Sequence, residues 1–498
     1  MLDVRDLTVR YYNRSKPSVS DVTLHLAEGE FVVLGGDSAS GKSTLVQTVC
    51  GFIPWIIPAE VRGDIKILDK RHDDPTTIAR TVCMVQQDPE TQFCTETVEE
   101  EVAFGPENLR VQRERIREVV DSSLLSVNAS HLKLRKLSTL SGGEKQKVAI
   151  ASMLALEPKL LILDEPTSSL DPKSVREVVS AIELLRRKER MTTVVVEHRV
   201  NDFVDMASRV ILMKEGRVVD DLVSGQPSYD KFRSGLAKSI SYVRGSRSER
   251  TAIEAEGLSY GIAGTPILDN VCFSVREGAV VALMGENGAG KTTLLRLLMG
   301  LARPQEGKIT IFNHTITASA PVDPWLLGRD IGFVFQNPNH QLFENSVERE
   351  IRFASLNYRT LVSAADAAIA RFENSEEVSR HVHPNCLSFG QKRRVNILSS
   401  SSHGPRLVML DEPFIGQDRN NSEKIVEMIA GLQKESKTVI VVTHDIDFAV
   451  SFCTDIVLMK RGRLLVSGAA KDCAPKVLEE FEGGEAEHGP GTIPESSD

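Results

Sequence analysis

The sequence is poor in aromatic residues and has no excess of positive charge. Aromatic side chains make up 5% of the 498 residues, and 60 Lys and Arg stand against 69 Asp and Glu, a formal net charge of -9. A nucleic-acid backbone therefore finds no bulk electrostatic attraction, and we expect no nucleic-acid partner. With 41% hydrophobic and 26% charged residues, the composition is that of a soluble globular protein and excludes a disordered or collagen-like chain.

Closely spaced cysteines and long apolar runs are also lacking. The seven cysteines are scattered and never have the CxxC spacing, which argues against a disulfide framework and a zinc site and favours a reducing compartment. The most apolar early stretch, residues 51–58, is interrupted by prolines and is shorter than the roughly 20 residues that a membrane span needs. We therefore expect a cytoplasmic protein that would serve a membrane only through another chain.

What the sequence does contain is an internal duplication. GDSASGKST and GENGAGKTT place Lys42 and Lys291 249 positions apart, and later matching pairs keep offsets of 246 to 249. A period of this length indicates two domains rather than a solenoid. We predict one domain at residues 1–235 and a second at 251–475. A basic linker at 236–250 would join them, and an acidic, disordered tail would follow at 476–498.

Each repeat alternates short β-branched runs with helical patterns. Runs at residues 31–36, 160–165 and 192–198 of the first repeat are apolar almost throughout. Runs at 280–285, 407–412 and 438–444 match them in the second. Continuous apolar runs are typical of parallel strands covered on both faces. The sequence therefore predicts an α/β fold in each repeat.

A glycine-rich loop follows the first of these strands in both repeats. The pattern is Gly-x4-Gly-Lys-Ser/Thr, and a helical segment comes directly after it. Glycines let backbone N–H groups close around phosphate oxygens at the helix N-terminus. The lysine would reach the β- and γ-phosphates of ATP, and the last hydroxyl would ligate Mg²⁺. The candidate residues are Gly36, Ser38, Gly41, Lys42, Ser43 and Thr44, and in the second repeat Gly285, Asn287, Gly288, Gly290, Lys291, Thr292 and Thr293.

Two acidic residues end a later strand in each repeat. LLILDEP contains Asp164 and Glu165, and LVMLDEP contains Asp411 and Glu412. At a strand end the first carboxylate can support Mg²⁺, and the second can orient or deprotonate an attacking water. A lone acidic pair after a strand is usually a solvated turn. Its repetition behind two phosphate loops favours the catalytic role.

A helix with an anion-binding start precedes each acidic pair. LSGGEKQ begins at Ser141, Gly142 and Gly143, and LSFGQKRR contains Ser388 and Gly390. Together with the phosphate loops and the strand acids, this pattern resembles the signature of the ATP-binding cassette (ABC) ATPases over nearly the whole chain. The resemblance implies two tandem P-loop ATPase domains. Each would have a RecA-like core, an antiparallel β subdomain and a helical subdomain that carries the signature.

The resemblance implies roles for further residues. Tyr11 matches the aromatic residue that stacks on adenine, although Tyr12 is adjacent, and Ile262 takes this place in the second repeat. Each repeat would also carry a Q-loop glutamine that contacts Mg²⁺ and water, a switch histidine near the γ-phosphate and a D-loop aspartate. These are Gln87 and Gln336, His198 and His444, and Asp171 and Asp418. The Mg²⁺ ligands would be Ser43, Gln87, Asp164, Thr292, Gln336 and Asp411.

Two segments after the first Q-loop and one around His198 make the resemblance more specific. QDPETQF, AFGPENL and VEHR look like the ATPases of energy-coupling factor (ECF) importers, which take up vitamins and metal ions. The second repeat keeps Gln341 but replaces AFGP at residues 352–355. The resemblance implies a peripheral protein on the inner face of the cell membrane. It would contact T-type and substrate-binding S-type membrane subunits through Gln92–Leu109 and Gln341–Tyr358.

Two other tandem ABC classes remain as alternatives. Monosaccharide-type importers use a chain of similar size, but the segment after the Q-loop does not look like theirs. ABC-F translation factors bind ribosomes, and typically carry a long charged insert and basic surfaces. The short linker and the net charge of -9 speak against them, while six Lys and Arg between residues 231 and 250 speak for them.

The signatures predict that the two sites are unequal. By the resemblance, cassettes pair head to tail within a chain or between chains, and the signature of one closes the site of the other. Phe389 replaces a signature glycine, so the site of Lys42 would lose an aligned donor, which costs about 10²–10³ in rate. Ile262 would weaken adenine stacking at the other site by about 1–3 kcal/mol, a loss that saturating ATP offsets.

We therefore expect Glu412→Gln to reduce ATP hydrolysis much more than Glu165→Gln, provided that the cassettes pair in this heterologous way. Steady-state rates of the two single mutants at saturating ATP, with the membrane partner present, measure the difference. Equal losses would remove the asymmetry, and a larger loss for Glu165→Gln would reverse it.

Overall fold

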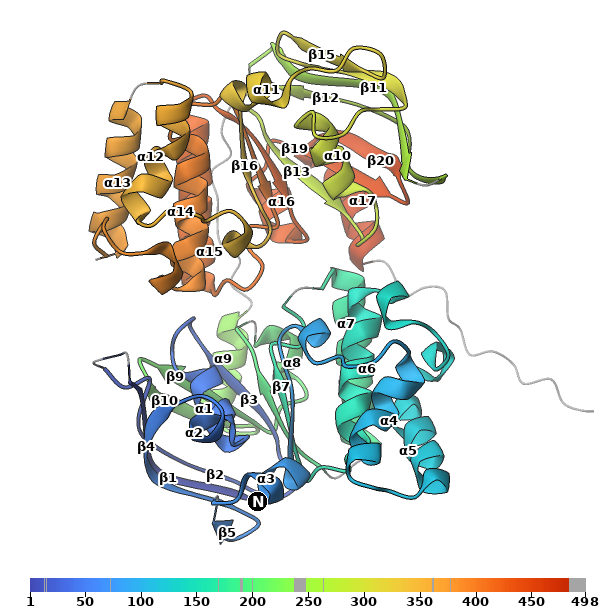
Figure 1. Cartoon of the computed structure of the whole chain (residues 1–498), viewed down its shortest axis with the longest axis vertical. Helices are drawn as coiled ribbons and strands as arrows, with labels where there is room; N and C mark the ends of the chain where they lie inside the picture. Colours follow the sequence, from blue (N-terminus) through green and yellow to red (C-terminus); the bar gives the residue numbers. More distant parts are fainter. Residues whose placement is uncertain are drawn as a thin grey trace, which may run out of the picture. The chain divides into compact units, whose positions relative to one another are not determined.

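Two β-sheets and a set of helices make up each repeat (Figure 1). The computed structural model describes residues 1–482 except 13, 15, 72, 169, 189–190, 199, 237–247, 263, 361 and 377. Most of the predicted linker, Arg199 of the VEHR motif and the predicted tail beyond Glu482 therefore lie outside the described residues. The chain divides into two compact units, Met1–Lys238 with Gly416–Ser422, and Ser239–Ile415 with Glu423–Asp498.

The first repeat has an antiparallel sheet and a mainly parallel sheet. The antiparallel sheet has the order β2-β1-β4-β5 and the parallel sheet the order β10-β9-β3-β8-β7-β6, in which only β10 runs antiparallel to its neighbour. The strands are β1 (Leu2–Tyr11), β2 (Val19–Leu26), β3 (Phe31–Gly36), β4 (Ala59–Ile67), β5 (Lys70–Arg71), β6 (Val82–Val85), β7 (Leu160–Asp164), β8 (Thr192–Val196), β9 (Arg209–Lys214) and β10 (Arg217–Val223). The helices are α1 (Lys42–Val49), α2 (Phe52–Trp55), α3 (Pro75–Thr81), α4 (Val98–Asn108), α5 (Arg113–Ser126), α6 (Gly142–Leu154), α7 (Pro172–Lys188), α8 (Asn201–Val204) and α9 (Pro227–Leu236).

The second repeat has the same two sheets. Their orders are β12-β11-β14-β15 and β16-β17-β18-β13-β19-β20. The strands are β11 (Thr251–Ile262), β12 (Thr265–Arg276), β13 (Val280–Gly285), β14 (Glu306–Ile311), β15 (His314–Thr317), β16 (Ile331–Val334), β17 (Leu407–Asp411), β18 (Thr438–Val442), β19 (Asp455–Lys460) and β20 (Arg463–Ala469). The helices are α10 (Lys291–Leu298), α11 (Pro324–Asp330), α12 (Val347–Asn357), α13 (Val362–Glu376), α14 (Phe389–Ser401), α15 (Arg419–Lys434), α16 (Ile446–Ser451) and α17 (Ala470–Glu482).

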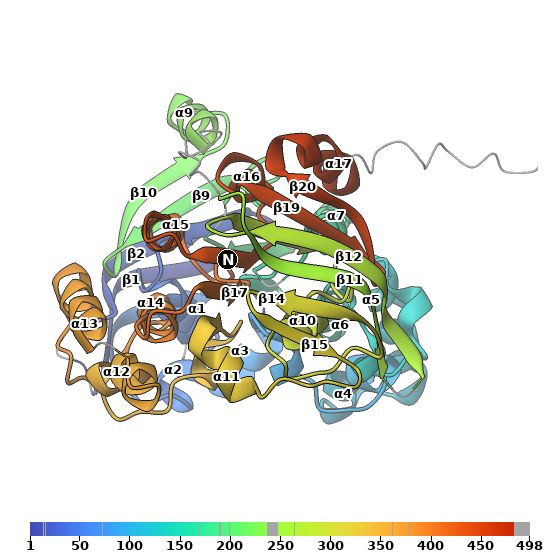
Figure 2. The same ribbon diagram turned by 90° about the horizontal axis from the view of Figure 1, so that it is seen from above.

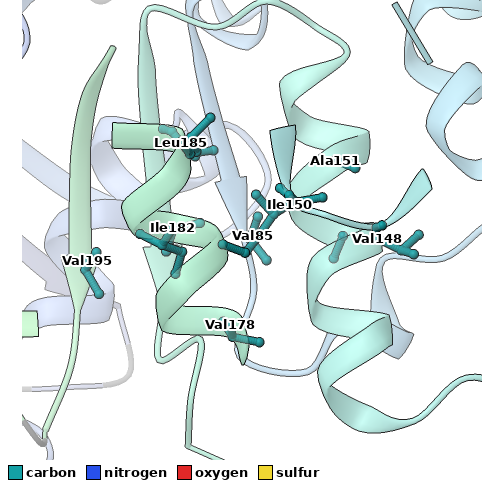
Figure 3. Packing of buried hydrophobic residues seen from close by; sticks show 14 of the residues in the cluster. Val85, Val148, Ile150, Ala151, Val178, Ile182, Leu185 and Val195 are labelled. Carbon is teal, nitrogen blue, oxygen red and sulfur yellow. The ribbon is translucent and has the colours of Figure 1, made fainter. Parts of the chain in front are cut away.

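The parallel strands are apolar throughout because both of their faces are covered. Val33 of β3 packs in a cluster with α6 and α7, while its neighbour Val32 packs in a second cluster with α1 and the antiparallel sheet. Figure 3 shows the first cluster, where Ile150 of α6 and Ile182 of α7 lie near Val85 of β6. Burial of each such side chain contributes about 1.5–3 kcal/mol. The α/β prediction is confirmed for both repeats.

In each repeat, the signature helix packs with two other helices of the same repeat. α4 and α5 pack with α6 in the first repeat, and α12 and α13 pack with α14 in the second (Figure 2). The predicted helical subdomains are therefore present. Among the residues that the structure describes, no helix has the length and apolar character needed to cross a bilayer.

The prediction of a disordered tail from residue 476 is wrong for residues 476–482, which form the end of α17. Val477 and Phe481 are buried in the core of the second repeat, against strand residues such as Ile456. With Cys473, these residues recur every four positions, which places them on one helical face. The acidic residues between them hid this spacing in the sequence.

Candidate functional site

The phosphate loops join the first parallel strand of each repeat to the following helix. Gly36 and Gly285 have φ angles of 140° and 149°, a region that favours glycine. A Cβ atom would lie 2.2 Å from Met213 O at Gly36, and 2.4 Å from Met459 O at Gly285. No other residue fits at these two positions without a backbone shift. The predicted strand-loop-helix context is present in both repeats.

The loop lysines are buried and held by the loops themselves. Lys42 is 4% exposed, and its Nζ donates to Gly36 O at 2.7 Å and to Asp37 O at 3.0 Å. Lys291 Nζ donates to Gly285 O at 2.6 Å. Burial lowers the pKa of Lys42, because a charged ammonium is poorly solvated there. The ammonium groups are thus fixed inside the loops, where an anionic ligand would gain from their charge.

A histidine and a glutamate lie beside each lysine. His198 Nε2 is 2.6 Å from Glu165 Oε1, and His198 Nδ1 is 3.3 Å from Lys42 Nζ. Burial opposes the charged form of His198, but the hydrogen bond and charge of Glu165 outweigh burial and raise the pKa of the histidine. The geometry recurs in the second repeat, where His444 Nε2 is 3.0 Å from Glu412 Oε1 and 3.4 Å from Lys291 Nζ.

The two glutamates sit in an unusual backbone conformation directly after their strands. Glu165 and Glu412 have φ angles of 49° and 47°, which costs a residue other than glycine of order 1–3 kcal/mol. Their N–H groups donate to Val196 O and Val442 O of the neighbouring strands. The predicted strand runs are therefore one residue too long at these ends.

The aspartates end strands β7 and β17 and are buried. Asp164 Oδ1 has no hydrogen-bond partner among the described residues. Burial, with the charge of Glu165, raises the pKa of Asp164 to about 7, and burial with Glu412 raises the pKa of Asp411 to about 6. An unpaired buried carboxylate oxygen fits a hard divalent cation such as Mg²⁺, which would restore the charged form.

A magnesium ion would need ligands beyond these carboxylates. Within the described residues, no group of three or more His, Cys, Asp or Glu side chains forms a metal site by itself. Ser43 and Thr292 follow the loop lysines at the starts of α1 and α10, and their role as hydroxyl ligands stays a prediction. The donor set therefore fits an ion that also takes phosphate and water oxygens, which is the usual mode for Mg²⁺.

The Q-loop glutamines differ between the repeats. Gln87 Nε2 donates to Glu165 Oε2 at 2.8 Å, so this residue joins the histidine–glutamate pair. In the described part of the chain, no hydrogen bond joins the Gln336 side chain to Glu412. Only the Gln336 backbone carbonyl is held, by the guanidinium of Arg393. The structure therefore assembles the predicted set more completely in the first repeat.

The signature serines and the D-loop aspartates begin helices. Ser141 and Ser388 are the N-caps of α6 and α14, each with a reciprocal capping box. Gly142 and Gly143 form the first turn of α6. Asp171 Oδ1 accepts from two N–H groups at the start of α7, and Asp418 Oδ1 accepts from Asn421 N at 2.7 Å. Contacts of these residues with a nucleotide stay a prediction.

Tyr11, rather than Tyr12, lies beside the first phosphate loop. Its hydroxyl is 3.2 Å from Thr44 Oγ1 in α1, whereas Tyr12 is 76% exposed. Ile262 is exposed in the second repeat. The position of Tyr11 suits the expected adenine contact, which also stays a prediction.

Comparisons with known proteins identify the family of this chain. The family model described as ABC transporter matches residues 19–168 and 268–415. A Methanosarcina mazei protein named as an ABC transporter ATP-binding protein is 33% identical over 94% of this chain and 88% of its own length. The chain belongs to the ABC transporter family. The ATP-binding proteins of this family are ATPases, so the two repeats are ATP-binding cassettes of an ATPase.

Two further relatives have more specific names. YkoD of Bacillus subtilis, named for HMP/thiamine import, is 32% identical over 94% of this chain and 91% of its own length. A solved structure described as cbiO1 of Clostridium perfringens, part of the ABC transporter complex cbiONQ, is 31% identical. It covers 47% of this chain and 94% of its own, with a TM-score of 0.41.

One buried carboxyl group of the first cassette was missed by the sequence analysis. Glu197, directly before His198, is 2% exposed, and its Oε1 accepts from Thr167 Oγ1 at 2.7 Å and from Thr167 N at 3.3 Å. It ties the segment after Glu165 to the segment of the switch histidine. The signal was a single charged residue in an otherwise apolar run. The second cassette has Thr443 at this place.

We expect Glu197 to make the stability of the first cassette depend on pH. Burial raises its pKa to about 7, whereas an unfolded glutamate titrates near its ordinary value of about 4.3. The Glu197 carboxyl group therefore stays protonated in the folded chain at pH values where it has already lost its proton in the unfolded chain. Its contribution to the free energy of unfolding falls as the pH rises from about 4.3 to 7. Glu197→Gln keeps an acceptor oxygen for Thr167 but can no longer titrate.

Relative to Glu197→Gln, the unfolding free energy of the wild type should fall by up to about 3 kcal/mol between pH 5 and pH 8. Urea unfolding in a Trp325→Phe background measures it, because Trp55 of the first cassette is then the sole tryptophan reporter. A difference between the two proteins that stays constant with pH would contradict the assignment.

Proposed function

We propose that this chain is the ATP-hydrolysing subunit of an ECF-type importer, and that it drives uptake of a vitamin or a metal ion through separate membrane subunits. The proposal of ATP hydrolysis rests on one observation. In both cassettes a buried lysine, a histidine and a glutamate lie together at the ends of parallel strands. Similarity to YkoD over nearly the full length of both chains, with the ECF-like segments after the Q-loops, supports the import part.

The residues of each cassette have distinct tasks in hydrolysis. Mg²⁺, when bound, offsets the charge of the β- and γ-phosphates. In the first cassette Lys42 and the loop N–H groups would bind the phosphates, and Ser43 and Asp164 would hold the ion. Glu165 accepts a proton from the attacking water or orients it, and His198 and Gln87 fix the two oxygens of this carboxylate. The residues of the second cassette act in the same way, with Lys291, Glu412 and His444.

The segments proposed to meet the membrane subunits carry exposed apolar side chains. Phe343 is 62% exposed, and it packs edge-to-face on Phe353 at a centroid distance of 4.7 Å. Leu356 is exposed in the same segment, as are Phe104 and Leu109 in the first cassette. Exposed apolar groups of this kind mark interaction sites. We propose that they receive the T-type subunit.

The second glutamines of these segments have a different task. Gln92 accepts from Gln86 N at 2.9 Å and donates to Met84 O at 2.9 Å. Gln341 bonds in the same way to Phe335 N and Phe333 O. Both side chains therefore fix the start of the Q-loop against the segment that follows it. They shape the proposed docking surface without forming its exposed part.

A photo-reactive side chain at position 343 or 353 should cross-link to a membrane subunit of the importer in isolated membranes, because the two phenylalanines are exposed on the proposed surface. Position 465, which is exposed on β20 of the same cassette and lies outside both proposed segments, serves as the matched control. Cross-linking that maps the membrane partner to other segments would count against the assignment.

Changing Lys42 and Lys291 together to Ala should abolish nucleotide binding and solute uptake, because both cassettes lose the buried cation that binds phosphate. The fold should stay largely intact, since no hydrophobic core side chain changes. Uptake by the reconstituted transporter and binding of a fluorescent ATP analogue measure the effect. Normal uptake by the double mutant would refute the proposed function.

A further inference from the structure

The signature helix of the second cassette differs from its counterpart in residues that face the Q-loop. α14 presents side-chain donors along one face at spacings of three and four residues, where α6 of the first cassette has one amide and two apolar side chains. The second cassette has Arg393, Asn396 and Ser400 where the first has Gln146, Ala149 and Met153.

All three donors bind backbone carbonyls of residues 333–338. Arg393 Nη1 donates to Phe335 O at 2.6 Å, and Nη2 donates to Gln336 O. Asn396 Nδ2 donates to Pro338 O at 3.2 Å, and Ser400 Oγ donates to Phe333 O at 2.7 Å. The Q-loop of the second cassette is thus fastened to α14 at several points.

The central donor is a fully buried charge. Arg393 is 0% exposed, and burial lowers its pKa to about 10, which leaves it charged at neutral pH. Taking a guanidinium out of water is costly unless its hydrogen bonds are made. The two hydrogen bonds given above both go to Q-loop carbonyls, and they are charge-assisted and therefore strong.

The same guanidinium also contacts the signature. Its carbon lies 5.6 Å from the centroid of the Phe389 ring, four residues earlier on α14. A cation over an aromatic face at this distance is attractive. In the first cassette both partners are absent, since Gly142 and Gln146 stand at these positions. Phe389 and Arg393, the two residues that differ from the first cassette, therefore form one interacting pair.

We propose that Arg393 is a positioning residue that couples the Q-loop of the second cassette to its own signature. The guanidinium fixes the backbone from which Gln336 is presented, and it supports the ring of Phe389 through the same planar group. A shift of Phe389 would then displace the Q-loop, and a shift of the Q-loop would displace Phe389. The coupling is confined to the second cassette, and its effect on hydrolysis rests on the proposed role of Gln336.

Hydrogen exchange of the full-length chain tests the coupling without reference to activity. In Arg393→Gln, which introduces the residue of the first cassette, amides at residues 335–342 should exchange about tenfold faster or more, because two charge-assisted bonds are lost. Residues 86–93 should not change. Arg371→Gln removes an exposed arginine of the same cassette and serves as the matched control. Asn396→Ala is a milder second variant, and it should raise exchange in the same segment by less.

Unchanged exchange at 335–342 in both Arg393→Gln and Asn396→Ala, or faster exchange spread evenly over the second cassette, would overturn the proposal. Local acceleration at the Q-loop supports it. Arg393→Lys keeps the charge but loses the planar fork, so it should restore part of the protection.

ATPase kinetics separate positioning from general destabilisation. In a Glu165→Gln background, where only the second cassette hydrolyses ATP, Arg393→Gln should lower kcat by about ten- to a hundredfold while the KM for ATP stays nearly constant, because misplacement of the Q-loop affects alignment more than binding. Gln336→Ala tests the underlying role. If Gln336→Ala hydrolyses ATP normally, the proposed role of Gln336 fails, while the exchange result still decides the coupling. A rise in KM without a fall in kcat in Arg393→Gln would contradict the positioning role.

Discussion

A buried ammonium group inside a tight glycine loop is the constraint on which each cassette depends. Lys42 and Lys291 can occupy these positions because loop carbonyls accept their hydrogen bonds, and because a histidine and a glutamate bring compensating polarity. The loop in turn needs glycine where the backbone passes within van der Waals contact of the neighbouring strand. The parallel sheet supplies both features, since its strand ends gather loop, glutamate and histidine at one edge.

The same fold buries different ionisable side chains in the two cassettes. The first cassette buries Glu197 beside its switch histidine, and the second buries Arg393 beneath its signature. Each replaces a neutral side chain of the other cassette, and each makes hydrogen bonds with atoms of the segments around the site. Duplication has therefore preserved the phosphate chemistry while changing the elements that hold the catalytic loops.

Most of the fold and the central site could be predicted from the sequence, because loop and strand chemistry is local. Gly36 and Lys42 lie within one motif, and Asp164 and Glu165 are neighbours at a strand end. The roles of Glu197 and Arg393 could not be recognised, because their hydrogen-bond partners are remote in sequence. Glu197 bonds to Thr167, and Arg393 bonds to Q-loop carbonyls. The helical end of α17 was missed because its acidic residues obscure the spacing of Val477 and Phe481.

The central claim is that one chain contains two separate nucleotide sites. The most direct measurement is the stoichiometry of ATP binding to the full-length chain in the presence of Mg²⁺, determined by equilibrium titration of a Glu165→Gln, Glu412→Gln double variant that does not consume the nucleotide. The account predicts two equivalents of ATP per chain, with one of them lost on Lys42→Ala and the other on Lys291→Ala. Binding of a single equivalent, or binding that survives both lysine substitutions, would contradict it.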